Sequence, residues 1–542
     1  MFKMKRLYSF LFTLFIPVLL FAQNIQRPRL IIGMVVDQMR WDYLYRYYDR
    51  YTAGGFKKLL EEGFSCENTL IPYTPSSTGP GHSCIYTGSV PALNGIAGNT
   101  WYDEQQNKVV YCADDNNVNT VGSTSAAGKM SPVNLWANTI TDELRLAANF
   151  RNKTIAIALK DRGSILPGGH TANAAYWFDN TSGGWISSTY YMKELPAWVK
   201  AINDKKLPEI YLKKNWNTLF PIATYTQSTP DEETWESGLL GGGTTFPHRT
   251  DTVNANKNEL LRSTPYGNTY TFDMAKAAIE NEQLGKHGET DFLALSFSST
   301  DYVGHGFGPN SIEAEDIFLR LDKDLADFIN YLDRTVGKGQ YLFFLSADHG
   351  AAHVPAFSRE HMMPAGATTE NALAAEINNQ LKKDFNVTGI VRMLMNYNVY
   401  LNHDVIAKNN LNRDFVCKSI IQALLKDQAV AGAFDLTHIQ DAPLTENLKT
   451  MVTNGYNQKL SGDIQYYMKP QWFEGGQKGT THGLWNPYDT HIPLVWYGWH
   501  VKTGYTNRET YMTDIAPTLA ALLHIQMPNA CIGKVIEEIM AR

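Results

Sequence analysis

A series of short, continuous apolar runs separated by helical patterns constrains the fold of this 542-residue chain more than any other feature. Apolar runs of this length are typical of strands that are buried on both faces. The runs are Leu30–Val36, Thr154–Leu159, Phe292–Phe297, Tyr341–Leu345 and Ile492–Tyr497. Helical periodicity lies between them, and strands that alternate with helices predict an α/β fold with a mainly parallel central sheet sandwiched by helices.

Two stretches interrupt this alternation. Residues 176–268 are rich in Trp, Tyr, Gly, Ser and Thr, and we expect them to form a loop-rich cap insertion with little core of its own. Residues 365–478 contain two helical patterns, Asn371–Phe385 and Asp414–Leu425, and β-like runs near Val391–Leu401. They predict a small α+β insertion. We therefore expect residues 23–542 to form a single domain that carries both insertions.

The first 22 residues predict a secretory signal peptide rather than part of the fold. Lys3, Lys5 and Arg6 precede an apolar stretch, Leu7–Ala22, that is short for a membrane-spanning helix. An uncleaved N-terminal anchor is the alternative. The prediction is a secreted protein, periplasmic if the host has two membranes, with no stable membrane association after cleavage.

Composition excludes several classes of partner. Lys plus Arg is 48 and Asp plus Glu is 54, so the formal net charge is −6. This mild acidity argues against nucleic acid as a partner, because nucleic acids favour basic surfaces. No C-x-x-C pair is present, so a thiolate zinc site has no support. The sequence leaves open the oligomeric state, a monomer included, and the disulfide pairing of Cys66, Cys84, Cys112, Cys417 and Cys531.

Polar side chains follow four of the five predicted strands. In open α/β sheets, ligands bind outside the carboxyl ends of the strands, so we expect these side chains to converge. They are Asp37, the pair Lys160 and Arg162, Asp301, and the pair Asp348 and His349.

Several of these residues have the donor atoms of a metal site. His305 follows Asp301 by four residues, His349 is next to Asp348, and His482 lies in a later Thr-His-Gly run. Oxygen and nitrogen donors without sulfur suit Zn²⁺, and less often Mn²⁺ or Fe²⁺. Either pair alone could be a simple turn, whereas their combination with Asp37 predicts a metal centre.

Thr78 is a candidate nucleophile. It lies in the Pro- and Gly-containing run Thr74–His82, immediately before a segment compatible with a helix. Free backbone N–H groups at a helix N-terminus favour an anion. A hydroxyl there could also be a simple helix cap, but beside a metal centre it is better interpreted as a nucleophile.

Six motifs together resemble the alkaline phosphatase superfamily, and more narrowly the phosphate-irrepressible, PafA-type alkaline phosphatases with a threonine nucleophile. The motifs occur in the family's order, and the resemblance covers essentially the whole mature chain. They are Thr78–His82, Asn99–Tyr102, Lys160–Gly163, Ser298–His305, Ala347–Gly350 and Thr481–Gly483.

The resemblance implies an alkaline phosphatase-like fold, two zinc ions per chain and a covalent phosphothreonine on Thr78. It implies that the first zinc ion is held by Asp301, His305 and His482. The second would be held by Asp37, Asp348, His349 and the Thr78 oxygen. The contacts to the phosphoryl oxygens would come from Asn99, Lys160 and Arg162.

Lys160 and Arg162 also indicate the class of substrate. A phosphate monoester has three free oxygens, and cations placed against all three favour it over a diester. The prediction is a broad-specificity phosphate monoester hydrolase that releases inorganic phosphate. The alternative is a phosphodiesterase or nucleotide pyrophosphatase of the same superfamily. A sulfatase is disfavoured because Ser76–Pro80 lacks a C/S-x-P-x-R pattern, and a non-catalytic binding protein because no site residue is missing.

Overall fold

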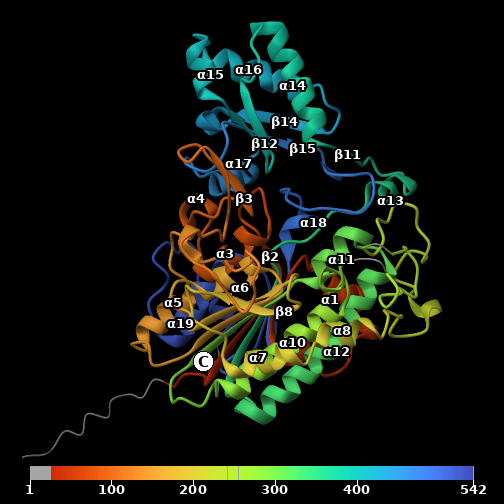
Figure 1. Ribbon diagram of the computed structural model, residues 1–542, viewed down its shortest axis with the longest axis vertical. Coiled ribbons are helices and arrows are strands. Elements are labelled where there is room, and N and C mark those ends of the chain that lie inside the picture. The colour runs from red at the N-terminus through yellow and green to blue at the C-terminus, as the bar shows by residue number, and fades with distance from the viewer. Residues whose placement is uncertain (1–25, 241, 254–255, 541–542) are drawn as a thin grey trace, which may run out of the picture.

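The computed structural model describes residues 26–240, 242–253 and 256–540, so the predicted signal peptide lies outside the described residues. A large body contains the central sheet, and a smaller lobe with α14 (Glu370–Phe385), α15 (His403–Lys408) and α16 (Arg413–Leu424) extends from it (Figure 1). Among the described residues, no helix combines the length and the apolar character needed to span a membrane.

An 11-stranded sheet forms the centre of the body. Its middle strands lie in the order β10 (Tyr341–Ser346), β1 (Leu30–Val36), β9 (Asp291–Phe297) and β6 (Thr154–Ala158), and these four are parallel to one another. Every residue of these four strands is buried. The fifth predicted strand is β18 (Leu494–Gly498), which pairs with β10 in the antiparallel direction. The prediction of an α/β fold with a mainly parallel sheet is confirmed.

The sheet extends on both sides through strands that the apolar runs did not reveal. They are β2 (Phe64–Leu70), β17 (His491–Ile492), β19 (Gly504–Tyr511), β7 (Ala174–Asp179), β8 (Gly184–Ser188) and β5 (Thr120–Val121). The segment outside the sheet therefore begins later than the expected start of the first insertion, about residue 176, which falls inside β7. Its aromatic composition resembles that of the following loops, but Tyr176 and Trp177 are buried in a strand parallel to β6.

Helices cover both faces of the sheet. On one face Tyr86 of α3 (Thr78–Thr87) packs against Phe292, with ring centroids 6.0 Å apart. On the other face Phe272 of α10 (Tyr266–Asn281) packs against Phe297 at 4.4 Å. The further helices of the body are α1 (Tyr43–Arg46), α2 (Phe56–Glu62), α4 (Pro91–Asn94), α5 (Ile140–Ala147), α6 (Asp161–Gly168), α11 (Ser299–Phe307), α12 (Ile312–Leu332), α13 (Pro355–Glu360), α18 (Pro487–Thr490) and α19 (Ile515–Leu523).

The segment between β8 and α10 contains α7 (Ala197–Asp204), α8 (Leu207–Leu212), α9 (Lys257–Arg262) and irregular chain. It rests on the first turns of α12. Asp316 of α12 accepts hydrogen bonds from the Trp216 indole at 2.7 Å and from the Leu219 backbone at 2.6 Å. Trp216 is fully buried and belongs to the main hydrophobic core, so this segment is packed onto the body.

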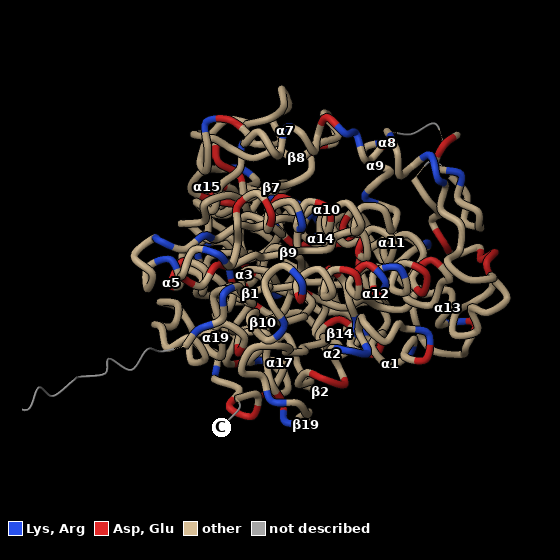
Figure 2. The backbone as a smooth tube through the Cα atoms, turned by 90° about the horizontal axis from the view of Figure 1, so that it is seen from below, with Lys and Arg blue, Asp and Glu red and all other residues tan. Residues whose placement is uncertain are grey.

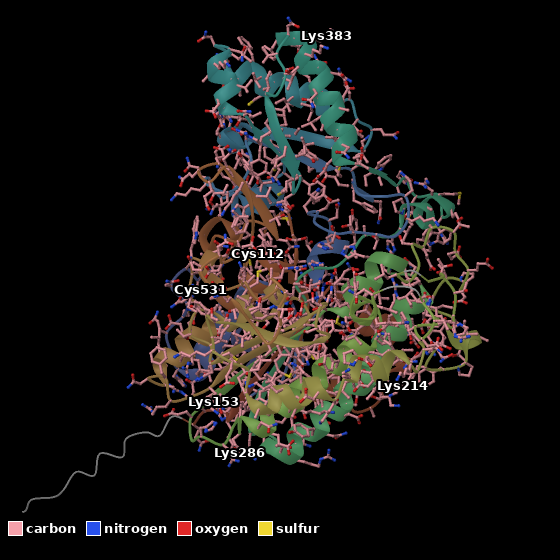
Figure 3. The ribbon with its side chains drawn as sticks, in the orientation of Figure 1. Cys112, Lys153, Lys214, Lys286, Lys383 and Cys531 are labelled. Carbon is pink, nitrogen blue, oxygen red and sulfur yellow. The ribbon has the colours of Figure 1, made fainter. Side chains whose placement is uncertain are left out.

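The smaller lobe has a hydrophobic core of its own, in which Val416 and Ile420 of α16 are fully buried. Lys383 of α14 marks the outer end of the lobe in Figure 3. Its sheet has the order β12 (Val391–Met395), β13 (Asn398–Leu401), β15 (Ile464–Met468) and β14 (Val430–Asp435), with every pairing antiparallel. Its remaining elements are β11 (Gly366–Thr368), α17 (Glu446–Gly455) and β16 (Trp472–Glu474).

The described residues form no disulfide, and charges of the two signs are not segregated along the chain. All five cysteines are free, and Cys112 and Cys531 are labelled in Figure 3. Basic and acidic residues are interspersed along the chain, as Figure 2 shows.

Candidate active site

The carboxyl ends of the four parallel strands meet at one place. Asp37 follows β1, Lys160 lies two residues beyond β6, and Asp348 lies two residues beyond β10. Asp301 lies in the first turn of α11, the helix that follows β9. The Asp37 backbone N–H donates to the Phe297 carbonyl at 3.1 Å, which continues the β1–β9 register into the site.

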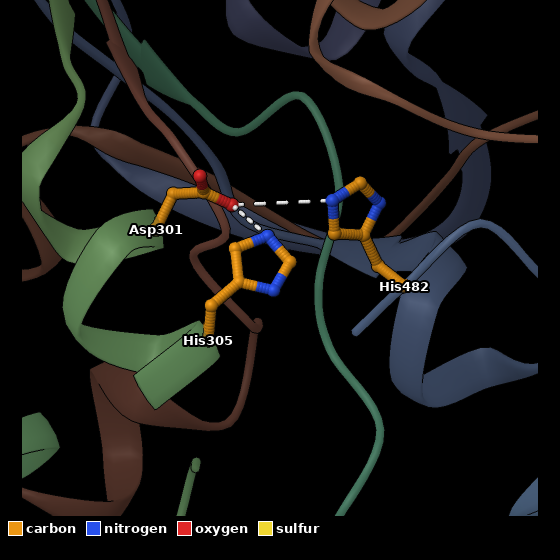
Figure 4. A group of neighbouring side chains, drawn as sticks. All are labelled: Asp301, His305 and His482. Carbon is orange, nitrogen blue, oxygen red and sulfur yellow. Dashed lines mark ion pairs between the residues drawn. The ribbon is translucent and has the colours of Figure 1, made fainter. Parts of the chain in front are cut away.

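Asp301, His305 and His482 form a first group of possible metal ligands (Figure 4). Asp301 and His305 are one turn apart on α11, and Asp301 Oδ1 lies 3.1 Å from His305 Nε2. His482 comes from the loop before α18, and its Nε2 is 3.9 Å from the same oxygen. Two imidazoles therefore face one carboxylate oxygen.

Asp37, Asp348 and His349 form a second group, and all three are fully buried. His349 Nε2 lies 3.4 Å from Asp37 Oδ1 and 3.6 Å from Asp348 Oδ2. None of these three atoms has a hydrogen-bond partner. Unpaired polar atoms are costly inside a protein, so the convergence of these three acceptor atoms fits a bound cation.

Backbone carbonyls orient the imidazoles of both groups. Each imidazole has Nδ1 within hydrogen-bond distance of a carbonyl oxygen, at 2.8 to 3.2 Å. Because a carbonyl can only accept, Nδ1 donates and Nε2 is the free acceptor, as metal ligation requires. Burial also lowers the pKa of His349 and of His482, which keeps these two rings neutral. The carbonyls belong to Thr480 for His305, Gly350 for His349 and Ser76 for His482.

These donor sets fit divalent cations. Each group combines carboxylate oxygen with imidazole nitrogen and has no sulfur, which is the donor chemistry of zinc and of similar transition metals. Burial raises the pKa of Asp37, and the neighbouring carboxylates of Asp301 and Asp348 raise it further. Bound cations would relieve this repulsion, because they would stabilise the ionised carboxylates.

Thr78 is the first residue of α3, and Ser77 before it is extended. The Thr78 side chain is buried, and its Oγ1 lies 3.4 Å from Lys160 Nζ and 3.4 Å from an Arg162 terminal nitrogen. The threonine hydroxyl therefore lies at a helix N-terminus and beside two cationic side chains. This is an arrangement in which an anion bound next to the hydroxyl is stabilised.

Lys160 connects the two groups of ligands. Its Nζ lies 2.6 Å from Asp37 Oδ2 and 2.6 Å from Asp301 Oδ2, and the residue is 4% exposed. Burial opposes the charge, but Asp301 and Asp37 outweigh this effect and hold the pKa of Lys160 above its usual value. Arg162 is held from its other side, where a terminal nitrogen donates to the Tyr111 hydroxyl at 3.1 Å.

Asn99 reaches the same place from the segment before β3 (Thr100–Asp103), which pairs with β4 (Lys108–Tyr111). Its Oδ1 accepts a hydrogen bond from the Gly79 backbone N–H at 2.7 Å. This bond fixes the side chain next to Thr78 and leaves the amide NH₂ group as a donor. The structure thus brings all the predicted site residues into one cluster.

Two side chains outside the predicted set also contact the ligand groups. Gln38 donates from Nε2 to Asp301 Oδ1 at 2.8 Å and from its backbone to Asp348 Oδ1 at 3.2 Å. His82 lies one turn after Thr78 on α3, with Nδ1 3.3 Å from Asp348 Oδ2. The signal for Gln38 was a polar residue directly after a predicted metal ligand, and that for His82 was its four-residue spacing from Thr78.

The chain matches the family model described as type I phosphodiesterase / nucleotide pyrophosphatase over residues 31–499. Alkaline phosphatase PhoV of Synechococcus elongatus is 53% identical over 96% of this chain and 94% of that protein. A protein of Myroides odoratus named calcium-transporting ATPase is 52% identical over 95% of each chain. The crystal structure of wild-type alkaline phosphatase PafA has a TM-score of 0.92 at 48% identity, covering 95% of this chain and 100% of that one.

The matched region includes the four parallel strands from Ile31 onward, the residues at their carboxyl ends and the smaller lobe. The chain therefore belongs to the type I phosphodiesterase / nucleotide pyrophosphatase family and, within it, to the PafA-type alkaline phosphatases. This confirms the resemblance that the six sequence motifs indicated, and with it the prediction that the chain is an alkaline phosphatase.

Proposed function

We propose that the protein is an exported, broad-specificity phosphate monoester hydrolase that uses two zinc ions and Thr78 as its nucleophile. One observation carries the proposal: two groups of metal-ligand atoms flank Lys160, whose Nζ touches a carboxylate of each group and lies 3.4 Å from Thr78 Oγ1. Divalent cations held by these ligand atoms, beside the buried Thr78 hydroxyl, would stabilise charge on the attacking and leaving oxygens of an in-line displacement.

The proposed reaction has two steps, and both use Thr78. Thr78 Oγ1 forms the new bond to phosphorus as the bond to the leaving oxygen breaks, which gives a phosphothreonine and an alcohol. Water then cleaves the phosphothreonine, which regenerates Thr78 and releases inorganic phosphate. Two divalent cations bound at the ligand groups supply Lewis-acid chemistry: they lower the pKa of the attacking hydroxyl and offset developing negative charge.

Asn99, Lys160 and Arg162 select the substrate. The Asn99 amide, the Lys160 ammonium and the Arg162 guanidinium all lie around Thr78, where the phosphoryl oxygens would sit. Phosphoryl transfer depends mostly on positioning and charge stabilisation, so donors directed at all three free oxygens favour a monoester. A diester, which has one of these oxygens esterified, would leave one buried donor unpaired.

The description of the matched family favours a second candidate, a phosphodiesterase or nucleotide pyrophosphatase. Such an enzyme would use the same cations and the same threonine. The two candidates differ in their need for Lys160 and Arg162, because these cations are best used by a substrate with three free oxygens.

Rates on matched substrates test the proposal. We expect the purified protein to hydrolyse an aryl phosphate monoester far faster than the aryl diester or the aryl sulfate, and a chelator to abolish the activity. Lys160→Ala combined with Arg162→Ala should lower kcat/KM for the monoester by at least about 100-fold, with a much smaller loss for the diester. Equal losses on both esters would favour the phosphodiesterase.

The control for this pair is Lys200→Ala combined with Arg249→Ala, which removes the same two side-chain types from exposed positions. It should leave both rates unchanged. Export is tested separately, by fractionating the host cells and sequencing the mature N-terminus. A protein that keeps residues 1–22 would contradict that part of the proposal.

A further inference from the structure

The turn between β12 and β13 of the smaller lobe reaches back to the active site. Asn396 and Tyr397, its two central residues, have φ values of +52° and +58°, as in the two-residue turns that match the twist of a hairpin. The strands on either side belong to the lobe's own sheet, whereas the turn itself touches the body. We call Met395–Tyr397 the hairpin turn.

Asn396 contacts the residues on both sides of Asn99. Its Nδ2 donates to the Thr100 carbonyl at 2.7 Å. The same nitrogen lies against Gly98, where a Cβ atom would come within 2.5 Å of it. The Asn396 amide can approach only because Gly98 has no side chain. Asn396 therefore contacts the residue before Asn99 and the residue after it.

The turn makes two further contacts that fix its position. The Thr100 hydroxyl donates to Met395 Sδ at 3.5 Å. The Tyr397 ring lies against Gly483, the residue after His482, where a Cβ atom would be 3.1 Å from Cε2. The hairpin turn thus packs between the Asn99 segment and the His482 segment, which are far apart in the sequence.

We propose that Asn396 is a positioning residue that holds Asn99 against the phosphoryl group. This inference rests on the proposed function, because it assumes that Asn99 contacts a phosphoryl oxygen. Asn99 is already fixed at its side chain by Gly79 and at its carbonyl by the Cys112 backbone N–H at 2.9 Å. The Asn396 bond to Thr100 adds the third restraint, and it comes from the insertion rather than from the catalytic body.

Two substitutions remove the restraint without disturbing the turn. Asn396→Gly and Asn396→Asp both tolerate a positive φ, but neither donates a hydrogen bond to the Thr100 carbonyl, and aspartate repels it. We expect kcat/KM for an aryl monophosphate to fall roughly tenfold or more, because small displacements of a positioned group are costly. Inhibition by inorganic phosphate should weaken in parallel, while zinc content and melting temperature stay close to those of the wild type.

Asn410 provides matched controls, because it is exposed, lies in the same lobe and also has a positive φ of +50°. Asn410→Gly and Asn410→Asp should leave kcat/KM unchanged. A double-mutant cycle then isolates the coupling: in an Asn99→Ala background, Asn396→Gly should have little further effect on kcat/KM.

The outcomes separate this inference from the proposed function. If Asn99→Ala lowers kcat/KM but the Asn396 variants behave like the Asn410 controls, the positioning role is overturned and the proposed function stands. Full additivity of Asn396→Gly with Asn99→Ala would also overturn it. If Asn99→Ala itself has no effect, the proposed role of Asn99 fails, and this inference fails with it.

Discussion

At the scale of single residues, Gln38 connects the two metal-ligand groups through a backbone conformation that is unusual for glutamine. Its φ is +63°, which turns the side chain toward Asp301 while the backbone N–H faces Asp348. A residue that contacts both candidate ligand groups resembles the outer-shell partners that tune metal affinity in other proteins. We therefore expect Gln38 to affect metal retention more than the fold.

Shortening Gln38 tests this role. Gln38→Asn keeps a residue that tolerates positive φ but cannot reach Asp301 Oδ1, so we expect metal affinity to fall about 10- to 100-fold. Zinc retained during dialysis against graded chelator concentrations measures the effect. Gln283→Asn is the matched control, because Gln283 is exposed and has a φ of +55°. Equal zinc retention by the two variants would contradict the prediction.

Glu236 gives a pH-dependent prediction. Burial, with Glu313 and Glu233 nearby, raises the pKa of this carboxyl to about 10. The folded state therefore keeps a proton that the unfolded state releases above pH ~4.5, so rising pH destabilises the fold up to about pH 10. Glu236→Gln removes this penalty.

We expect the melting temperature of Glu236→Gln to exceed that of the wild type at pH 9, with the difference shrinking toward pH 5. Thermal melts across this range measure it. Exposed Glu232→Gln should melt like the wild type at every pH. A constant difference between Glu236→Gln and the wild type would show that ionisation of Glu236 is not the cause.

The proposed site residues could be expected to lie together because each of them follows a buried strand or lies in a short polar motif. Asp37, Asp301 and Asp348 could be placed together from topology alone. Gln38 and His82 could not be assigned roles, because their contacts depend on the φ of one residue and on the packing of α3 against Asp348. Such contacts leave no pattern in a single sequence.

At the scale of elements, α3 determines where Thr78, the proposed nucleophile, lies relative to the second ligand group. Its Gly81 faces Asp348 so closely that a Cβ atom would lie 2.6 Å from the Asp348 Cβ and 2.6 Å from its carbonyl oxygen. The helix backbone therefore approaches the ligand segment directly, one turn after Thr78.

A methyl group at this contact should displace α3. We expect Gly81→Ala to lower the free energy of unfolding by about 1–3 kcal/mol and to reduce monoesterase activity sharply, because overpacking moves Thr78 and Asp348 apart. Chemical denaturation and steady-state rates measure the two effects. Gly476→Ala is the control, because its nearest neighbour would be 3.8 Å away. Wild-type behaviour of Gly81→Ala would contradict this account of α3.

The central strands could be predicted from the sequence, whereas the strands toward the edges of the sheet could not. The buried parallel strands could be identified because they are continuously apolar, whereas β2 (FSCENTL) and β7 (AAYWFD) contain polar residues or resemble loops in composition. β18 could be identified as a strand, but not its antiparallel direction, because pairing direction depends on the path of the chain. The edges of the sheet were therefore the part that the sequence predicted least well.

At the scale of the whole molecule, the proposed cations would join parts of the chain that are hundreds of residues apart. Their ligands come from the ends of β1 and β10, from α11, and from the loop that carries His482. The overall charge of −6 does not oppose an anionic substrate, because cations and Lys160 would make the site locally positive. If these segments share bound cations, the stability of the fold should depend on metal occupancy.

Removing the metal should therefore destabilise the molecule as a whole. A cation that binds only the folded state stabilises it by about 2.7 kcal/mol per site when its free concentration is 100 times Kd. We expect a chelator to lower the melting temperature by several degrees, and zinc added in excess to restore it. In His482→Ala, which lacks one ligand of the first group, the chelator should cause a clearly smaller shift. His438→Ala, which removes an exposed imidazole, should respond like the wild type. Identical melting temperatures with and without chelator, under conditions in which activity is lost, would show that the cations do not connect these segments.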